Sequence, residues 1–113
     1  MTILEDVNTV LTPLNIPIET GVFSGSVPNE YLVLTPLVDT YALHADNFPH
    51  ADVQEVRISI FTTGGYTAIK KQVLNALLSA EFTITDRRYL GFDTETGYHG
   101  YSIDAQKNYE MED

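Results

Sequence analysis

The triplet His-Ala-Asp occurs twice within a short segment, and histidine and aspartate are residue types that bind metal ions. The copies are His44-Ala45-Asp46 and His50-Ala51-Asp52. In an extended segment, the histidine and the aspartate of each copy would project to the same side. A catalytic zinc site needs about three such protein ligands, oriented by further hydrogen bonds. The four residues therefore raise the hypothesis of a small metal-dependent enzyme.

The residues around the two triplets favour a different interpretation. Asn47 and Pro49 stand between the copies, and these residue types are common in turns and loops. The third histidine, His99, belongs to a separate predicted element. We therefore favour a polar loop between two strands, which binds no metal and no cofactor, and keep the enzyme as a remote alternative. If the four residues of the triplets have a function, we expect it to be contact with another subunit.

Other catalytic patterns are weak. The chain has no cysteine, and its serines do not stand in a G-x-S-x-G motif. Gly64-Gly65 precedes a predicted helix but fits neither the Walker nor the dinucleotide-binding pattern. Carboxylates at Asp93, Glu95 and Asp104 could form an acid–base pair, although acidic residues in turns usually bond to their own backbone. We predict no catalytic residue and a protein that is not an enzyme.

Composition and charge narrow the class of protein further. A chain of 113 residues suits one domain, 1–113, and we expect residues 110–113 to be frayed. Apolar residues make up 43%, which is enough for a core. Sixteen acidic and six basic residues give a formal charge of -10, which disfavours binding to nucleic acid through a positive patch.

The sequence also bears on the compartment. Without cysteine, the chain needs no oxidising environment. The N-terminal segment lacks the basic start and the apolar run of a signal peptide, and no stretch approaches the roughly 20 apolar residues of a membrane helix. We expect a soluble intracellular protein with no membrane partner.

Two segments have helical periodicity. Thr2 and Glu5 have the spacing of a capping box, and the helix that follows ends near Thr12-Pro13. A second helix is predicted over residues 66–82, with Thr62, Thr63 or Gly65 at its start. The apolar face of the first helix comprises Leu4, Val7, Leu11 and Leu14, and that of the second comprises Ile69, Val73, Ala76, Leu77 and Ala80.

Strand patterns fill most of the remaining chain. The clearest strand spans 53–63, where Val56, Ile58 and Ile60 alternate with polar residues. Pro36 should produce a bulge or mark a sheet edge between strand pieces at 31–34 and 38–43, and a short strand is predicted near 18–23. Strands at 83–92 and 98–111 form a hairpin through 93–97. We predict an α+β fold, an antiparallel sheet of four to five strands with two helices packed on one face.

Tyrosine is concentrated in the final hairpin, which holds four of the seven: Tyr89, Tyr98, Tyr101 and Tyr109. Tyrosine is common at protein interfaces, but it also favours strands, and the sequence does not separate these two explanations. We expect the long C-terminal strand to lie at a sheet edge and to pair with another chain. Its residues Tyr98, His99, Tyr101 and Tyr109, with Glu95 in the turn before it, complete the candidate interface with another subunit.

Several segments resemble the tail-completion or tail-terminator proteins of long-tailed bacteriophages, which are also described as head–tail joining proteins. The similar segments are the strand Val56–Thr62, the helix from Tyr66 to Leu78 and the run Glu95-Thr96-Gly97-Tyr98-His99. The earlier segment "NEYLVLTPL" and the aspartates Asp46 and Asp52 are also similar. Together the likeness extends over most of the chain from Asn29 to Tyr109.

This resemblance implies a structural protein that forms a hexameric ring at the top of the tail tube, ends tail polymerisation and joins the tail to the head. Its expected partners are copies of itself, the tail tube protein and a head-completion or connector protein, and DNA passes through the ring without sequence-specific binding. The expected location is the neck of the virion, after assembly in the host cytoplasm. A head-completion, stopper or other neck connector protein is the alternative. An acidic DNA mimic is disfavoured because the acidic residues are scattered.

Overall fold

The computed structural model describes the backbone of residues 2–20, 28–43 and 49–110, and the side chains of 2–19, 28–37 and 53–109. Two α-helices, one 3₁₀ helix and five strands follow one another within these residues. They are α1 (Ile3–Leu11), η1 (Thr12–Leu14), β1 (Ile18–Thr20), β2 (Glu30–Leu43), β3 (Pro49–Thr62), α2 (Thr67–Ser79), β4 (Thr83–Phe92) and β5 (His99–Glu110).

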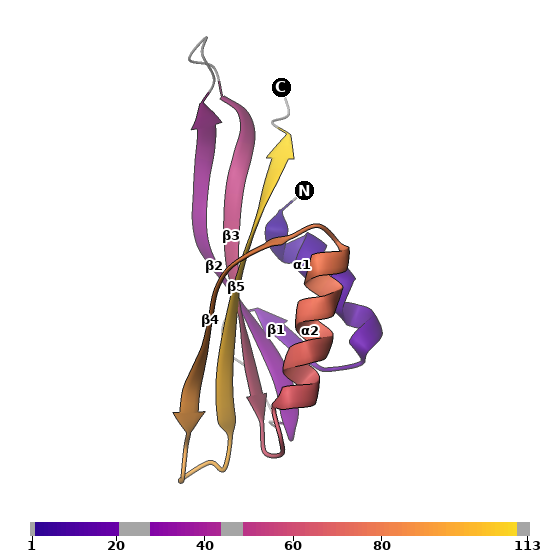
Figure 1. Ribbon diagram of the computed structural model, residues 1–113, viewed down its shortest axis with the longest axis vertical. Helices are drawn as coiled ribbons and strands as arrows, with labels where there is room; N and C mark the ends of the chain where they lie inside the picture. The colour runs from indigo at the N-terminus through magenta and orange to yellow at the C-terminus, as the bar shows by residue number, and fades with distance from the viewer. Residues whose placement is uncertain (1, 21–27, 44–48, 111–113) are drawn as a thin grey trace.

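The strands form one sheet in the order β1-β2-β3-β5-β4, and both α-helices lie on the same side of it (Figure 1). The predicted α+β class, strand number and one-sided helices are confirmed. The sheet is mixed, because the short β1 runs parallel to β2 while the other three strand pairs are antiparallel. The molecule measures 53 × 25 × 24 Å, with the β2–β3 hairpin at one end and the β4–β5 hairpin at the other (Figure 1).

The position of β5 differs from the prediction. We expected this strand at a sheet edge, but it lies between β3 and β4 from His99 to Gln106, so that prediction is wrong for most of the strand. Only from Lys107 onward does β5 pair with β3 alone among the described strands. The alternating pattern of β5 could not reveal this, because alternation reports which residues share a face and not which strands are neighbours.

The second His-Ala-Asp triplet also differs from the prediction. β3 begins at Pro49, so His50-Ala51-Asp52 is part of a strand, and the interpretation of this triplet as a loop is wrong. The strand extends this far because it has partners on both sides, and Asp52 pairs in register with Tyr41 and with Tyr109. The first triplet, with His44 and Asp46, lies outside the described residues.

Pro36 has the effect that its chemistry predicts. β2 runs without a break from Glu30 to Leu43, but its register with β3 shifts between Pro36 and Val38. The described part of β1 pairs with β2 only over Leu32–Leu34, so Pro36 also lies beyond the end of that pairing. Proline has no backbone N–H to donate. A register shift and a position beyond the described β1 pairing both tolerate a missing hydrogen bond.

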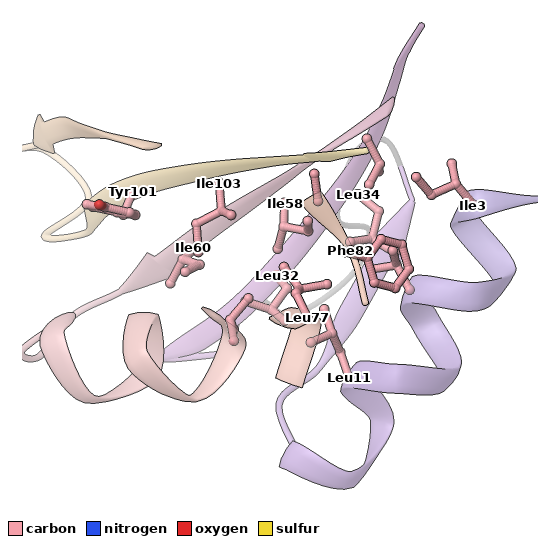
Figure 2. Packing of buried hydrophobic residues seen from close by; sticks show 14 of the residues in the cluster. Ile3, Leu11, Leu32, Leu34, Ile58, Ile60, Leu77, Phe82, Tyr101 and Ile103 are labelled. Carbon is pink, nitrogen blue, oxygen red and sulfur yellow. The ribbon is translucent and has the colours of Figure 1, made fainter. Parts of the chain in front are cut away.

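The core lies between the sheet and the two helices. Leu32, Ile58 and Ile103 are fully buried on the side of the sheet that faces the helices (Figure 2). The helices contribute buried residues at four-residue steps: Ile3, Val7 and Leu11 from α1, and Ile69, Val73 and Leu77 from α2. Most of the predicted helical faces are therefore confirmed, although Ile3 is buried where we expected Leu4, and Leu4, Leu14, Ala76 and Ala80 are only partly buried. Neither α-helix of the described residues has the length and apolarity to cross a membrane.

The two helices begin differently. The Thr2 hydroxyl accepts a hydrogen bond from the Glu5 N–H at 3.3 Å, as predicted for the start of α1. The residue before α2 is Tyr66, whose side chain makes no capping hydrogen bond. The hydroxyl of Thr62 instead accepts a hydrogen bond from the Gly64 N–H at 3.1 Å and so stabilises the turn before the helix.

Polar contacts tie α1 to the far end of β5. Asp6 Oδ2 accepts hydrogen bonds from Tyr109 Oη at 2.8 Å and from Lys107 Nζ at 3.2 Å. The Ile3 N–H donates to Gln54 Oε1 of β3 at 2.9 Å. Burial first, and then the hydrogen bond to Asp6, raise the pKa of Tyr109 above its ordinary value of 10.0. These contacts fix the position of α1 on the sheet.

Substitution of two neighbouring leucines in α2 tests the assignment of the core. Leu77 is fully buried, while Leu78 is 56% exposed. We expect Leu77→Ala to lower the free energy of unfolding by about 2–5 kcal/mol, because it leaves a cavity between α2 and the sheet. Leu78→Ala should change it by no more than ~0.5 kcal/mol. Urea denaturation measures both values, and equal losses would contradict this packing.

The contact between Tyr109 and Asp6 predicts a loss of stability at high pH. Because the pKa of Tyr109 is higher in the folded chain, the stabilisation is complete below a pH of about 10 and declines as the pH rises above it. In Tyr109→Phe this decline should be absent, so the difference in unfolding free energy between wild type and variant should shrink above about pH 10. A difference that stays constant across this range in urea titrations would contradict the contact.

Candidate assembly interface

The turn between β4 and β5 is built by Asp93. Its carboxylate Oδ1 accepts the Glu95 N–H at 2.9 Å, and its backbone O accepts the Gly97 N–H at 2.7 Å. Gly97 has φ 79°, a conformation that glycine adopts without steric cost. Asp93 therefore has the structural role that is usual for a turn aspartate, and Glu95 lies exposed in the same turn.

A bulge just before this turn places the side chains of Tyr89 and Leu90 on opposite faces of the sheet. The register between β4 and β5 shifts between Tyr89 and Gly91, and Gly91 has φ 111°. Tyr89 pairs with Tyr101 and stacks on Tyr66 before α2, so it lies on the helix side of the sheet. Leu90 instead packs over Gly100 on the opposite side, which we call the open face; a Cβ added to Gly100 would lie 3.2 Å from Leu90 Cβ. The bulge thus places apolar side chains on both faces of the hairpin.

The open face carries a groove of about 460 Å³ at this end of the sheet. Tyr31 and Phe61 stack there with ring centroids 5.0 Å apart, and Tyr98 meets Tyr31 edge-on at 5.6 Å. The Tyr98 hydroxyl donates to the backbone oxygen of Pro28. Gly100 lies between the side chains of Phe61 and Leu90, and the absence of a side chain there opens the groove.

A second aromatic cluster lies on the helix side of the same hairpin. Tyr66 stacks on Tyr89 at 5.1 Å and on Tyr101 at 5.6 Å. The Tyr89 hydroxyl and His99 Nδ1 are 2.9 Å apart and share a hydrogen bond. The ring of Phe92 lies 4.7 Å from that of His99. His99, which was predicted to lie in an interface, is therefore held within an aromatic cluster. The side chains of His44 and His50 lie outside the described residues.

Much of this apolar surface is in contact with solvent. Tyr89, Leu90 and Phe92 are 46%, 53% and 50% exposed. A contiguous cluster of exposed aromatic and aliphatic side chains is typical of a protein interface, whereas single exposed apolar residues are common on any surface. We call Tyr31, Phe61, Leu90, Phe92 and Tyr98, which all line the groove, the hairpin-end surface, and it is the candidate assembly interface.

The predicted interface residues divide between the two ends of the molecule. Tyr98, His99 and Tyr101 do come together at the β4–β5 hairpin, with Glu95 in its turn. Tyr109 lies toward the opposite end of β5, where it bonds to Asp6.

The backbone positions of His50 and Asp52 are also at this far end of the sheet, in β3, while His44 and Asp46 lie outside the described residues. The four residues of the two triplets therefore share no described site. No group of three or more potential metal ligands is found among the described residues.

Sequence reasoning missed Tyr31, Phe61, Leu90 and Phe92. Tyr31 and Phe61 are neighbours only because β2 and β3 pair in register at these positions. Leu90 and Phe92 flank Gly91, and a glycine near a strand end is a recognised signal of a bulge. That glycine could have indicated that the side chains beside it change direction.

Farther along the open face, the sheet is covered by charged and polar pairs. Arg57 donates from Nε to Asp104 Oδ1 at 2.9 Å and from Nη2 to Asp104 Oδ2 at 3.1 Å. This hydrogen bonding is the main reason that the pKa of Arg57 is raised. The Thr85 hydroxyl donates to a Glu55 carboxylate oxygen next to this pair. Asp104, considered above as an acid–base candidate, thus has a structural partner.

Comparison with known proteins gives a fold but no family. No family of proteins matches the sequence, and no curated protein is significantly similar to it. Solved structures do match, and one is a chain from the virion of a native gene transfer agent particle. That match covers 90% of this chain and 84% of the other, with a TM-score of 0.51 and 13% sequence identity. At this identity the match shows a shared fold.

Two leucines with nearly equal exposure allow a matched test of the hairpin-end surface. Leu90 lies in it, 53% exposed, whereas Leu78 lies on α2, 56% exposed. We expect Leu90→Ser to weaken association with the assembly partner at least tenfold, because it removes apolar area that binding would bury. Leu78→Ser should leave association unchanged, and both variants should retain the unfolding free energy within ~0.5 kcal/mol. Equal binding by the two variants, compared at matched folded concentrations, would argue against this interface.

Proposed function

We propose that this protein is a structural component of a phage-like virion. The observation that carries the proposal is the shared fold with a chain of the gene transfer agent virion, which extends over most of both chains. The exposed aromatic hairpin-end surface supports a role in assembly. A component of a particle needs such surfaces for its neighbours, and this chain places one at the end of an elongated body.

Within that class, we propose a tail terminator. In this role, six copies form a ring at the top of the tail tube, stop its growth and provide the surface to which the filled head binds. The partners are the tail tube protein and a head-completion or connector protein, and assembly takes place in the host cytoplasm. The resemblance of the central strand, the second helix and the Glu95–His99 run to such proteins supports this role.

We further propose that the role requires no catalysis. The described polar groups that could have served an active site are engaged in structural contacts: Asp104 with Arg57, Asp93 with the backbone of its own turn, and His99 with Tyr89. The formal charge of -10 suits a ring through which DNA passes, because like charge prevents the DNA from adhering.

Particles assembled without the protein test this role. We expect tails of uncontrolled length, seen by negative-stain electron microscopy, because nothing would end polymerisation of the tube. Expression of the wild-type protein in the same cells should restore a single length and serves as the control. Tails of normal length beside heads that lose DNA would indicate a stopper instead. Normal particles in normal yield would overturn a structural role altogether.

A further inference from the structure

The outer edge of β4 has no strand beside it among the described residues. β4 stands last in the order of the sheet and pairs only with β5. The segments at its two ends, residues 80–82 and 93–97, are both described. Seven of the ten residues of β4 are exposed, so its side chains as well as its backbone can contact another molecule. A strand edge of this kind offers N–H and C=O groups to an extended segment.

The two neighbouring arginines of β4 lie on opposite faces of the sheet. Arg87 pairs in register with Ile103, which is buried beneath the helices, so its side chain lies on the helix side. Arg88 pairs with Ser102 and binds Asp86 at 2.9 Å on the open face. Arg87 is exposed and has no carboxylate partner within the described part of the chain. Its charge is therefore available to another molecule.

α2 adds positive charge on the same side of β4. Lys70 Nζ lies 5.1 Å from the ring centroid of Tyr101, which pairs in register with Tyr89 of β4. α2 contains no aspartate or glutamate, and Asp86, the one acidic residue of β4, lies on the open face. We call Lys70 and Arg87 the basic strip. It stands out in a chain whose formal charge is -10.

We infer that β4 binds an extended acidic segment of a neighbouring virion protein, which pairs with the free edge and directs carboxylates toward Lys70 and Arg87. Backbone pairing supplies affinity in such a contact, and alternate side chains supply specificity. Since the side chains of a strand alternate between two faces, the segment should carry aspartate or glutamate at every second position. Leu90 of β4 belongs to the hairpin-end surface, so the segment would border that surface. The inference rests on the proposed virion role and names what a neighbour contributes.

Two other occupants match the basic strip less well. DNA is also negatively charged, but it offers no strand to pair with the edge, and the formal charge of -10 opposes its approach. β4 of a second copy could pair with the edge, and an antiparallel pair related by a twofold axis keeps like faces together. Asp86 could then meet Arg88 of the second copy on the open face, but Arg87 would still have no carboxylate.

Two matched pairs of charge reversals test the basic strip. Arg87→Glu and Arg88→Glu make the same change on opposite faces of β4, while Lys70→Glu and Lys71→Glu make it at neighbouring positions of α2. We expect Arg87→Glu to reduce incorporation of the protein into particles about tenfold, and Lys70→Glu about threefold, because each replaces attraction to the acidic segment by repulsion. Arg88→Glu and Lys71→Glu should each change incorporation by less than about twofold.

The four variants are compared at matched folded concentrations, which urea denaturation establishes. Equal losses within each pair would show that only net charge matters, and would overturn the contact with the basic strip. Incorporation of the wild-type chain, measured beside them, tests the proposed function separately.

Photochemical cross-linking in assembled particles identifies the segment that lies on β4. The wild-type chain has no cysteine, so a benzophenone maleimide attached to the variant Arg88→Cys labels β4 alone. Gln72→Cys, at an exposed position of α2, carries the same label in the control. Purified particles are irradiated, and mass spectrometry of the cross-linked peptides gives the sequence of the segment.

We expect Arg88→Cys, and not Gln72→Cys, to be linked to a segment of another virion protein with acidic residues at alternate positions. Links to DNA, to β4 of a second copy or to a segment without that pattern would overturn the inference. Particles that contain the labelled protein but give no link from β4 would also overturn it, and would leave the proposed function standing. Particles that contain none of the wild-type protein would overturn both.

Discussion

Burial of one face of β3 is the constraint on which the rest of the structure depends. Val56, Ile58 and Ile60 are fully buried, because both helices cover their side of the sheet. β3 also pairs with β2 on one side and β5 on the other along nearly its whole length. A shift of one residue in either register would turn these three side chains outward. The alignment of β2 and β5 with β3, and through β5 that of β4, is thereby fixed.

The hairpin-end surface follows from this fixed register. Tyr31 and Phe61 meet because their strands are aligned by the core residues beside them, Leu32 and Ile60. The bulge at Tyr89–Gly91 then departs from regular alternation and presents Leu90 on the face away from the helices. A rigid core and one local irregularity are sufficient to build an apolar surface at the tip of a hairpin. Such surfaces gain affinity from being preorganised, since less conformational entropy is lost on binding.

Local signals in the sequence predicted much of the fold. Alternation and turn chemistry located β4 at its observed bounds, and helical periodicity located Val7, Leu11, Val73 and Leu77 in the core. The signals failed where the outcome depended on pairing between distant segments. The central position of β5, the parallel β1 and the extension of β3 to Pro49 each depend on a partner strand. The candidate site was predicted only in part for the same reason: Tyr98 is local to the hairpin, whereas Tyr31 and Phe61 come from other strands.

Asp6 contacts Lys107 and Tyr109, which follow it in the chain by 101 and 103 positions. The first helix therefore has no complete docking site until β5 has left the ribosome. Long-range contacts of this kind slow folding, because a large loop must close before they contribute. A partly synthesised chain would hold β2 and β3 without β5, and the register that aligns the interface would be absent. The arrangement thus delays formation of the complete sheet until β5 has been synthesised.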